Sequence, residues 1–255
     1  MTALSARGLS VVFGGVRALD DVDLDIPGAG ITGLIGPNGA GKSTFIDAVS
    51  GFLPRNTRGR VEIDGRDVSR LSPHRRARAG FARSWQTQEL FEDISVAENL
   101  AVAARHLTPL SAIASYWSRT SVDDERVTAT LDLLELTGVA TREPRDLSPR
   151  DRKLVGIARA IVGRPAVVCL DEPAAGLDHR ETEWLGDQLL RIADSGVPVL
   201  LVDHDMSLVL RVCSTLHVLA QGQLIAAGEP GQVTQDPAVV SAYLGSAGTA
   251  GGRAS

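Results

Sequence analysis

Cysteine is scarce in this chain, and that scarcity excludes several kinds of fold and site. The 255 residues contain two cysteines, Cys169 and Cys213. Cys169 lies inside an apolar run, where a free thiol behaves as a small buried side chain. Two cysteines do not make the spaced sets that disulfide frameworks and most zinc sites need. We therefore expect neither a disulfide framework nor a metal framework.

Long apolar runs and concentrated positive charge are also absent. No stretch reaches the roughly 18 to 20 apolar residues that a membrane span needs, and the opening "MTALSARGLSVVF" lacks the apolar core and cleavage site of a secretory leader. The net charge is −5, and the basic residues are scattered along the sequence. We expect a soluble, cytoplasmic chain whose partners do not include nucleic acid.

What the sequence does contain is an alternation of short apolar runs with helical patterns. The runs "ITGLIG", "AVVCLDEP" and "VPVLLVDHD" are typical of buried strands, and "RVEID" is typical of a strand that ends at a turn. The segment "GKSTFIDAVSG" predicts a helix closed by Gly51. Such alternation indicates an α/β fold built on a parallel sheet.

The strand pattern stops between about Leu90 and Ala160. "SVAENLAVAARHL" and "VDDERVTATLDLLELTGV" carry apolar residues three and four apart, as amphipathic helices do, and "TPLSAIASYWSRTS" between them predicts a loop or a short irregular helix. The small residues of "GSAGTAGGRAS" predict a flexible tail. We expect one domain with a core of about residues 1–87 and 160–228, a helical lobe of about 88–159, a C-terminal helical segment of about 229–244, and a tail over 245–255.

The segment "GPNGAGKST" carries the strongest signal for chemistry. It fits the pattern G-x-x-x-x-G-K-[ST] and lies between a predicted strand and a predicted helix, as a phosphate-binding loop does. Backbone N–H groups and the helix N-terminus favour phosphate, Lys42 reaches the terminal phosphates, and Ser43 can bind Mg²⁺. A glycine-rich turn without a ligand is the plainer alternative. The predicted nucleotide-binding residues are Gly36, Pro37, Asn38, Gly39, Ala40, Gly41, Lys42, Ser43 and Thr44.

Two carboxylates, Asp171 and Glu172, end the apolar run "AVVCLDEP". Ligands of α/β sheets gather at the carboxyl ends of the strands. Asp171 is therefore predicted to hold Mg²⁺, mostly through water, and Glu172 to activate an attacking water. Alone, such a pair is as often a helix cap or a solvated surface feature, and the phosphate loop is what favours the catalytic interpretation.

The order of these segments resembles that of the ATP-binding cassette ATPases over about residues 4–244. The resemblance rests on the phosphate loop, the Gln of "ARSWQTQELF", the serine-started helix of "DLSPRDRKLVGIARA", "LDEPAAGLD" and the His of "LLVDHDM". "FGGVRALDDV", "HDMSLV" and "DPAVVSAYLG" are similar to the ATPase subunits of branched-chain amino acid importers. The resemblance implies ATP and Mg²⁺ as ligands. It also implies an α/β P-loop NTPase fold with a RecA-like core, an antiparallel β edge and an inserted helical subdomain.

The resemblance assigns roles to side chains that their own patterns leave open. It implies that Phe13 stacks on adenine, that Gln86 contacts Mg²⁺ or the attacking water, and that His204 contacts the terminal phosphate. By themselves these three read as a core aromatic, a surface amide and a structural histidine. Asp178 matches a loop that couples two active sites across a dimer.

The segment "LSPRD" departs from the family's LSGGQ-like helix start at three of its five positions. Ser148 is expected to cap this helix and to face the ATP of a partner subunit. Pro149 lacks an N–H, Arg150 stands where glycine permits close approach, and Asp151 brings negative charge toward a polyphosphate. Arg150 compensates only if it binds phosphate itself. Two copies would form two weakened sites, so a heterodimer with a second ATPase is favoured over a homodimer.

The sequence thus predicts the ATP-hydrolysing subunit of a transporter, peripheral on the inner face of the cell membrane. The expected partners are membrane permeases, contacted near Leu90, Phe91 and Ile94, a second ATPase and a periplasmic-type substrate-binding protein. Branched-chain amino acids, other amino acids, urea and amides stay open as substrates. The alternatives are a lipopolysaccharide-type exporter, a non-transport cassette ATPase and a phosphotransferase. The last two are disfavoured because the chain has no tandem cassette, no coiled-coil insert and no recognisable acceptor pocket.

Overall fold

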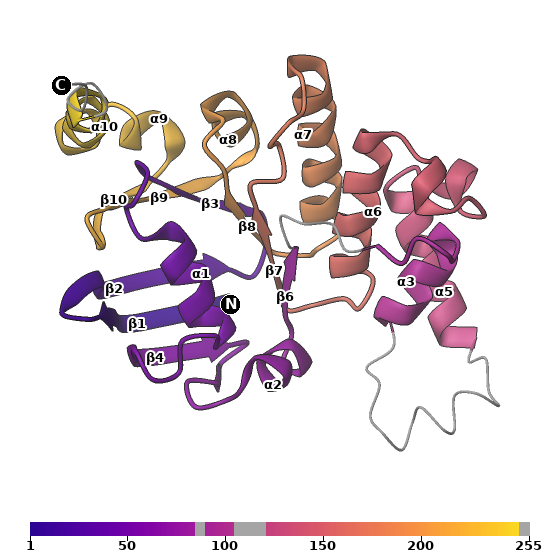
Figure 1. Ribbon diagram of the computed structural model, residues 1–255, viewed down its shortest axis with the longest axis horizontal. Helices are drawn as coiled ribbons and strands as arrows, with labels where there is room; N and C mark the ends of the chain where they lie inside the picture. Colours follow the sequence, from indigo (N-terminus) through magenta and orange to yellow (C-terminus); the bar gives the residue numbers. More distant parts are fainter. Residues whose placement is uncertain (85–89, 105–120, 250–255) are drawn as a thin grey trace.

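Two sheets organise the chain, in a computed structural model that describes residues 1–84, 90–104 and 121–249 (Figure 1). The antiparallel sheet has the strand order β2 (Val16–Pro27), β1 (Thr2–Phe13), β4 (Thr57–Ile63) and β5 (Arg66–Asp67). The larger sheet has the order β10 (Gln223–Gly228), β9 (Thr215–Ala220), β3 (Ile31–Ile35), β8 (Val199–Val202), β7 (Val167–Asp171) and β6 (Phe81–Ser84). Its strands are parallel except for β10, which pairs antiparallel with β9. The predicted α/β fold with an antiparallel edge is confirmed.

Helices connect these strands and cover the larger sheet. They are α1 (Lys42–Ser50), α2 (Pro73–Arg78), α3 (Val96–Ala104), α5 (Ser121–Leu133), the short η1 (Thr137–Val139) and η2 (Pro144–Asp146), α6 (Pro149–Ile161), α7 (His179–Asp194), α8 (Met206–Val212), α9 (Pro230–Val233) and α10 (Pro237–Thr249). Within the described ranges, no helix combines the length and hydrophobicity that crossing a membrane requires.

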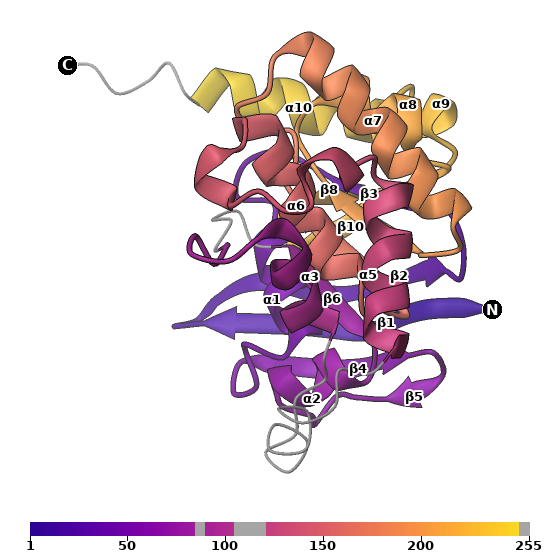
Figure 2. The same ribbon diagram turned by 90° about the vertical axis from the view of Figure 1, so that its right-hand side faces the viewer.

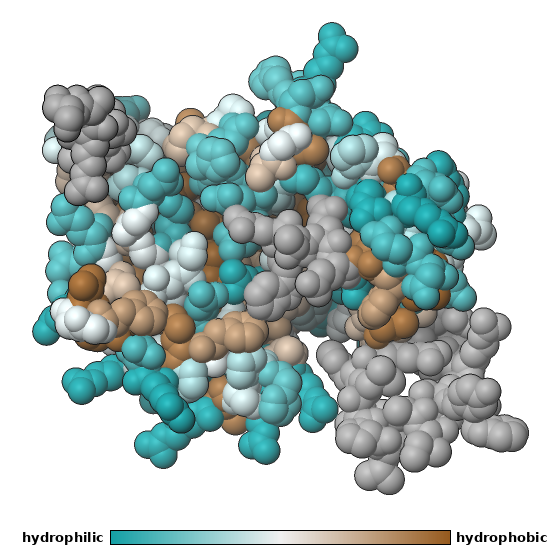
Figure 3. Space-filling model, viewed as in Figure 1, coloured by the Kyte–Doolittle hydropathy of each residue, from teal (hydrophilic) through white to brown (hydrophobic). Residues whose placement is uncertain are grey.

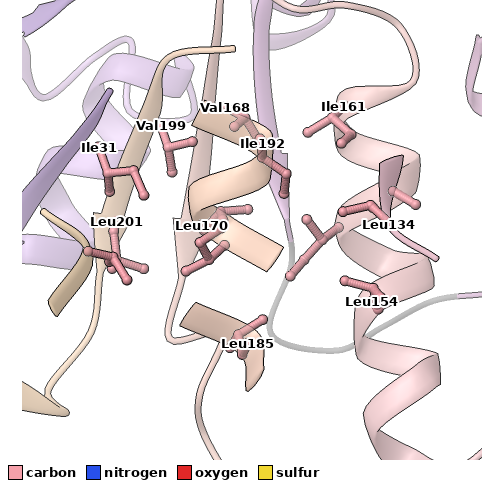
Figure 4. Close-up of a cluster of buried hydrophobic side chains, with 14 of the residues drawn as sticks. Ile31, Leu134, Leu154, Ile161, Val168, Leu170, Leu185, Ile192, Val199 and Leu201 are labelled. Carbon is pink, nitrogen blue, oxygen red and sulfur yellow. The ribbon is translucent and has the colours of Figure 1, made fainter. Parts of the chain in front are cut away.

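Alternation along the buried strands divides the core into two clusters. In β7, Val168 and Leu170 face one cluster, whereas Val167 and Cys169 face the other, because successive strand side chains point to opposite faces. The first cluster joins the sheet to α6, α7 and the helical lobe (Figure 4). The second joins it to α1 and the antiparallel sheet. The sheet is therefore buried on both faces, as its continuous apolar strands predict.

The helical lobe is made of α3, α5 and α6, which lie together beside the sheet (Figures 1 and 2). Leu100 and Leu134 of the lobe belong to the same apolar cluster as Val168 of β7. The lobe and the sheet thus share one core. The segment "TPLSAIASYWSRTS" falls almost wholly in residues 105–120, outside the described residues.

The C-terminal helix differs from the expectation of a flexible tail that begins at residue 245. Helix α10 continues through Thr249, and residues 250–255 lie outside the described part of the chain. The helix starts at Pro237, where the Asp236 carboxylate accepts a hydrogen bond from the Ala238 N–H at 2.8 Å. Extending an existing helix fixes one residue per hydrogen bond, so it costs less conformational entropy than nucleating a new helix. The chain can therefore continue α10 beyond residue 244.

Basic side chains are less evenly spread than the sequence led us to expect. Figure 3 shows hydrophilic side chains along its lower edge, where Figure 1 places β4 and α2. The exposed arginines of this region are Arg55, Arg58, Arg60, Arg66, Arg70, Arg75 and Arg78. Three acidic residues lie in the same segment, Glu62, Asp64 and Asp67. This surface is positive although the whole chain carries −5, and the expectation of scattered charge is wrong here.

One arginine of α2 is buried and supports the helix that follows the phosphate loop. The Arg76 guanidinium donates to the Ala48 and Val49 carbonyls, at 2.9 and 2.8 Å, and to those of Ser69 and Leu71, at 2.8 and 3.1 Å. The first two carbonyls belong to the last turn of α1, where i to i+4 partners end; the Ala48 carbonyl also accepts from the Gly51 N–H at 3.2 Å. Burial lowers the pKa of Arg76, yet an arginine stays protonated in proteins.

We expect Arg76→Met to lower the free energy of unfolding by about 2 to 4 kcal/mol, because four carbonyls lose a charged donor in a buried site. Urea unfolding followed by circular dichroism measures this change. Arg75→Met is the control, since Arg75 is exposed on the same helix and should change stability by less than about 0.5 kcal/mol. Equal effects of the two variants would contradict the capping role.

Candidate functional site

A helix start without any side-chain cap lies at the centre of the site. Strand β3 is buried throughout and ends at Ile35, and α1 begins at Lys42 after six intervening residues. The N-cap residue, Gly41, has no side chain, and the first turn carries no acidic residue. The N–H groups of this turn and the positive end of the helix dipole are therefore open to an anion.

Two glycines let the loop fold this closely against the rest of the protein. Gly36 has φ of 150°, and a Cβ there would lie 2.1 Å from the Leu219 carbonyl oxygen of β9. Gly41 has φ of 108°, and a Cβ would lie 2.7 Å from the Ala18 carbonyl oxygen of β2. Both positions exclude any other residue. The loop is thus clamped between the two sheets.

Lys42 folds back over the loop. Its Nζ donates to the carbonyls of Gly36 and Pro37, at 2.6 and 3.1 Å. Burial lowers the pKa of Lys42, and the charges of Glu172 and Asp171 oppose that shift. The structure therefore brings the phosphate-loop lysine and the two predicted carboxylates into one charge cluster.

Asp171 is the last residue of β7, and its carboxylate is held by an arginine that the sequence analysis missed. Arg83 of β6 contacts Asp171 Oδ2 through Nη2 at 2.9 Å, and Asp47 Oδ1 of α1 through Nη1 at 2.6 Å. The side chains of Arg83 and Asp171 are 12% and 8% exposed. Burial lowers the pKa of Arg83, but the hydrogen bonds to both carboxylates outweigh it and leave that pKa raised.

Glu172 occupies an unusual backbone conformation. Its φ is 48°, which few residues other than glycine adopt, and its N–H donates to the Val202 carbonyl at 2.7 Å. Strained residues of this kind cluster at functional sites. His204, which follows β8, places Nδ1 3.9 Å from Glu172 Oε1. The structure thus brings together Glu172 and His204, which the sequence predicted separately.

The residues fit a hydrated Mg²⁺ better than a caged metal. No group of three His, Cys, Asp or Glu side chains that could hold a metal ion occurs among the residues described here. Asp171 offers one carboxylate, and Ser43 offers an exposed hydroxyl in the first turn of α1. Mg²⁺ commonly takes one or two protein ligands and completes its shell with water and phosphate oxygens.

The start of α6 has a different geometry from the open start of α1. Ser148 is the N-cap: its Oγ accepts from the Asp151 N–H at 3.1 Å and donates to Asp151 Oδ2 at 2.8 Å. The Arg150 guanidinium carbon lies 4.2 Å from the centre of the Trp184 ring on α7. The hydroxyl proton of Ser148 is thus directed at Asp151, and Arg150 is directed at α7.

Two further side chains tie the segment after Glu172 to its neighbours. Asp203, which is buried, accepts from the N–H groups of Ala174, His204 and Asp205, at 3.1, 2.7 and 3.0 Å. Lys153 of α6 donates to the carbonyls of Pro173, at 2.9 Å, and Ala175. Sequence reasoning missed both, although the position of Asp203 directly before His204 was a signal.

Two more of the predicted site residues lie at the ends of their elements. Phe13 ends β1 with its ring partly exposed, as an aromatic that stacks on a ligand needs to be. Asp178 caps α7 in a capping box with Glu181. Gln86 lies in residues 85–89, outside the described residues.

The fold and this site define a P-loop nucleoside triphosphatase. A family model described as "ABC transporter" matches residues 19–175, and one described as "Branched-chain amino acid ATP-binding cassette transporter" matches residues 223–249. The chain belongs to the ABC transporter family and is its ATP-hydrolysing cassette, which confirms the resemblance drawn from the motifs.

Individual relatives cover nearly the whole chain. The high-affinity branched-chain amino acid transport ATP-binding protein BraF of Pseudomonas aeruginosa is 35% identical, over 96% of this chain and 98% of its own. The lipopolysaccharide export system ATP-binding protein LptB of Escherichia coli is 34% identical over the same shares. The ADP conformation of MJ1267, an ATP-binding cassette of an ABC transporter, superposes with a TM-score of 0.83 at 31% identity, covering 96% of this chain and 99% of that one.

We expect Lys42→Ala to abolish ATP binding, because the loop loses the charge that is predicted to meet the terminal phosphates. Glu172→Gln should bind ATP and trap a closed dimer, while hydrolysis falls by about 100-fold or more as the water loses its activating carboxylate. Equilibrium nucleotide binding, size-exclusion chromatography with ATP and phosphate release measure the three effects.

The matched control is Glu183→Gln, an exposed glutamate on α7 that should leave binding and hydrolysis unchanged. Hydrolysis is compared in an assembly in which the unmodified chain is active. Undiminished turnover of Glu172→Gln in that assembly would refute the role of Glu172.

Proposed function

We propose that this chain is the ATP-hydrolysing subunit of an importer for branched-chain or other amino acids, bound peripherally to the cytoplasmic face of the membrane. The observation that carries the import assignment is the match of residues 223–249 to the branched-chain amino acid transporter model. This segment lies outside the residues that the general ABC transporter model matches. The similarity to BraF supports it. Permeases would form the path, and a periplasmic-type binding protein would deliver the substrate.

An exporter ATPase is the second candidate, because LptB matches at 34% identity over equal coverage. Import is tested by reconstituting the chain with permeases and a periplasmic-type binding protein from the same organism and measuring ATP-driven uptake of labelled leucine, isoleucine and valine. Uptake of another amino acid, urea or an amide would redefine the substrate. A functional requirement for lipopolysaccharide extraction instead would favour the exporter.

In the proposed reaction, each group near the phosphate loop has one task. The N–H groups of α1 and Lys42 bind the phosphates, while Ser43 and Asp171 would hold Mg²⁺, which would neutralise phosphate charge. Glu172 accepts a proton from the attacking water. His204 contacts the terminal phosphate from the neighbouring strand, and Phe13 stacks on adenine. Gln86 completes the contacts to metal or water.

The geometry of α6 supports a heterodimer. A partner's ATP would approach this helix start, where the Ser148 proton is already given to Asp151 and Pro149 offers no N–H. The Arg150 guanidinium packs on Trp184, with its carbon 4.2 Å from the ring centre, and its Nε lies 3.7 Å from Asp151 Oδ1. Because Arg150 is engaged by Trp184 and Asp151, we infer that it does not compensate by binding a partner's phosphate. A second ATPase with an LSGGQ-like helix start would complete this chain's own site.

We expect the lone chain to bind ATP but to hydrolyse it poorly. The triple change Pro149→Gly, Arg150→Gly and Asp151→Gln should raise hydrolysis of the homodimer by about 10- to 100-fold, if roughly 1.4 to 2.8 kcal/mol of transition-state stabilisation returns. Phosphate release by each homodimer measures this gain.

In a heterodimer, the triple change should act on the site built around the partner's phosphate loop and leave this chain's own site nearly unchanged. The two sites are separated by introducing Lys42→Ala in this chain or its equivalent in the partner. Brisk hydrolysis by the unmodified homodimer, or no gain from the triple change, would count against the heterodimer.

A cleft between the sheet and the helical lobe is one of two surfaces proposed to receive a permease helix. The other surface surrounds Phe91, which does not line this cleft. The volume of the cleft is about 750 Å³, and its walls come from the end of α1, α2, β6, α3 and α6, including Phe52, Phe81, Ala103 and Ala160. Arg78 and His74 of the positive surface line the same cleft. A positive face beside the docking cleft suits a subunit held close to anionic lipid headgroups.

Of the docking residues predicted from sequence, Phe91 is the exposed one. Its side chain is 46% exposed, whereas Leu90 is 7% exposed and packs in the core. The Phe91 backbone is held by Asn99, which accepts from its N–H and donates to its carbonyl, both at 3.0 Å. The Phe91 ring also meets the Arg159 guanidinium, 5.1 Å from the ring centre.

We expect Phe91→Glu to abolish uptake by the assembled transporter while ATP hydrolysis persists, because a charge on this apolar contact prevents docking. Uptake in vesicles and phosphate release are measured on the same preparation. Val240→Glu is the control, since Val240 is similarly exposed on the distant α10. Normal uptake by Phe91→Glu would show that the permease binds elsewhere.

A further inference from the structure

The ion-pair bridge through Arg83 connects the helix of the phosphate loop to the carboxylate at the end of β7. Arg83 is in register with Cys169 of β7, and Asp171 lies on the same face of that strand two residues further on. Helix α1 packs over this face, as the shared cluster of Cys169 with Phe45 shows. The bridge is therefore fixed by the sheet register and by the packing of α1.

Asp47 is placed on α1 so that it joins the bridge to the metal-binding turn. It lies four residues after Ser43, so both side chains are on one face of the helix. Its carboxylate contacts Arg83 at 2.6 Å and is 38% exposed. Arg83 contacts Asp171 at Oδ2, at 2.9 Å.

The charges of this bridge do not cancel. Asp47 and Asp171 contribute one negative charge each, and Arg83 contributes one positive charge. If Arg83 faced Asp171 alone, the pair would be neutral and would attract a cation weakly. With Asp47 present, the bridge keeps one net negative charge beside Ser43.

We propose that Arg83 is a positioning residue that orients Asp171, and that Asp47 neutralises Arg83 so that Asp171 keeps its charge for Mg²⁺. This inference rests on the proposed role of Asp171 as the metal-binding carboxylate. It makes Asp47, a surface residue on α1, a determinant of metal affinity without itself being a ligand.

The test measures how much Mg²⁺ strengthens nucleotide binding by the full-length chain. Calorimetry gives the Kd of adenylyl imidodiphosphate, which is not hydrolysed, with excess Mg²⁺ and with EDTA. The Kd in EDTA divided by the Kd in Mg²⁺ is the ratio compared between variants, and a larger ratio means that Mg²⁺ strengthens binding more. Binding is used because it does not require a partner ATPase. Asp171→Asn is the reference, and we expect it to lower the ratio strongly.

Asp47→Asn should lower the ratio by about 3- to 10-fold and leave the Kd in EDTA within about 2-fold, because only the metal contribution depends on the neutralised bridge. Asp187→Asn is the matched control, since Asp187 forms a similar 2.6 Å ion pair with Arg211 away from the site. It should leave the ratio unchanged.

The decisive variant combines Asp47→Asn with Arg83→Met. Once Arg83 is gone, Asp47 has no charge to neutralise, so the double variant should recover the ratio that Asp47→Asn loses, to within about 2-fold of the unmodified chain. Arg83→Gln replaces Arg83→Met if the latter does not fold. If Asp47 and Arg83 only stabilise the fold, the double variant should lower the ratio by the combined effects of the two single changes.

The outcomes distinguish a failure of this inference from a failure of the proposed role of Asp171 as the metal-binding carboxylate. An unchanged ratio in Asp47→Asn, with a lowered one in Asp171→Asn, overturns the inference and leaves Asp171 as the metal carboxylate. A double variant no better than Asp47→Asn also overturns it. An unchanged ratio in Asp171→Asn overturns the proposed role of Asp171 and the inference with it.

Discussion

The close contact of the phosphate loop with two sheets is the constraint on which the rest of the structure depends. Gly36 lies against the backbone of β9 and Gly41 against that of β2, at distances that a Cβ does not allow. The start of α1 is therefore fixed relative to both sheets, and no side chain covers it. Every other group of the site is positioned from this point.

The charges around α1 form a connected arrangement. Lys42 rests on the loop carbonyls, the carboxylates of Asp171 and Glu172 face it from the end of β7, and Arg83 joins Asp171 to α1 from the edge strand. Burial makes each of these contacts stronger than it would be in water. The same burial makes each unpaired charge costly, which explains why the lysine and the arginine are both held by oxygens.

The N-termini of α1 and α6 differ in whether their hydrogen-bonding groups are already satisfied. Helix α1 begins with open N–H groups, whereas α6 begins with a serine whose hydroxyl is satisfied by Asp151 in the same turn. The proposed heterodimer rests on this contrast between an open and an occupied helix start. Asp203 and Lys153 hold the segment between Glu172 and α7, Asp203 from the β8 side and Lys153 from α6.

Local sequence determined the strands β3, β7 and β8, helix α1 and the phosphate loop, because continuous apolar runs, glycines at fixed spacing and the Lys-Ser-Thr triplet specify them without reference to distant residues. The same holds for the Ser148 cap and the capping box of Asp178, which are satisfied within one helical turn. Tertiary structure alone decided that Arg83 meets Asp171 and Asp47, and that Arg150 packs on Trp184. These contacts join residues far apart in the sequence, and neither periodicity nor spacing records which side chains the sheet order will bring together.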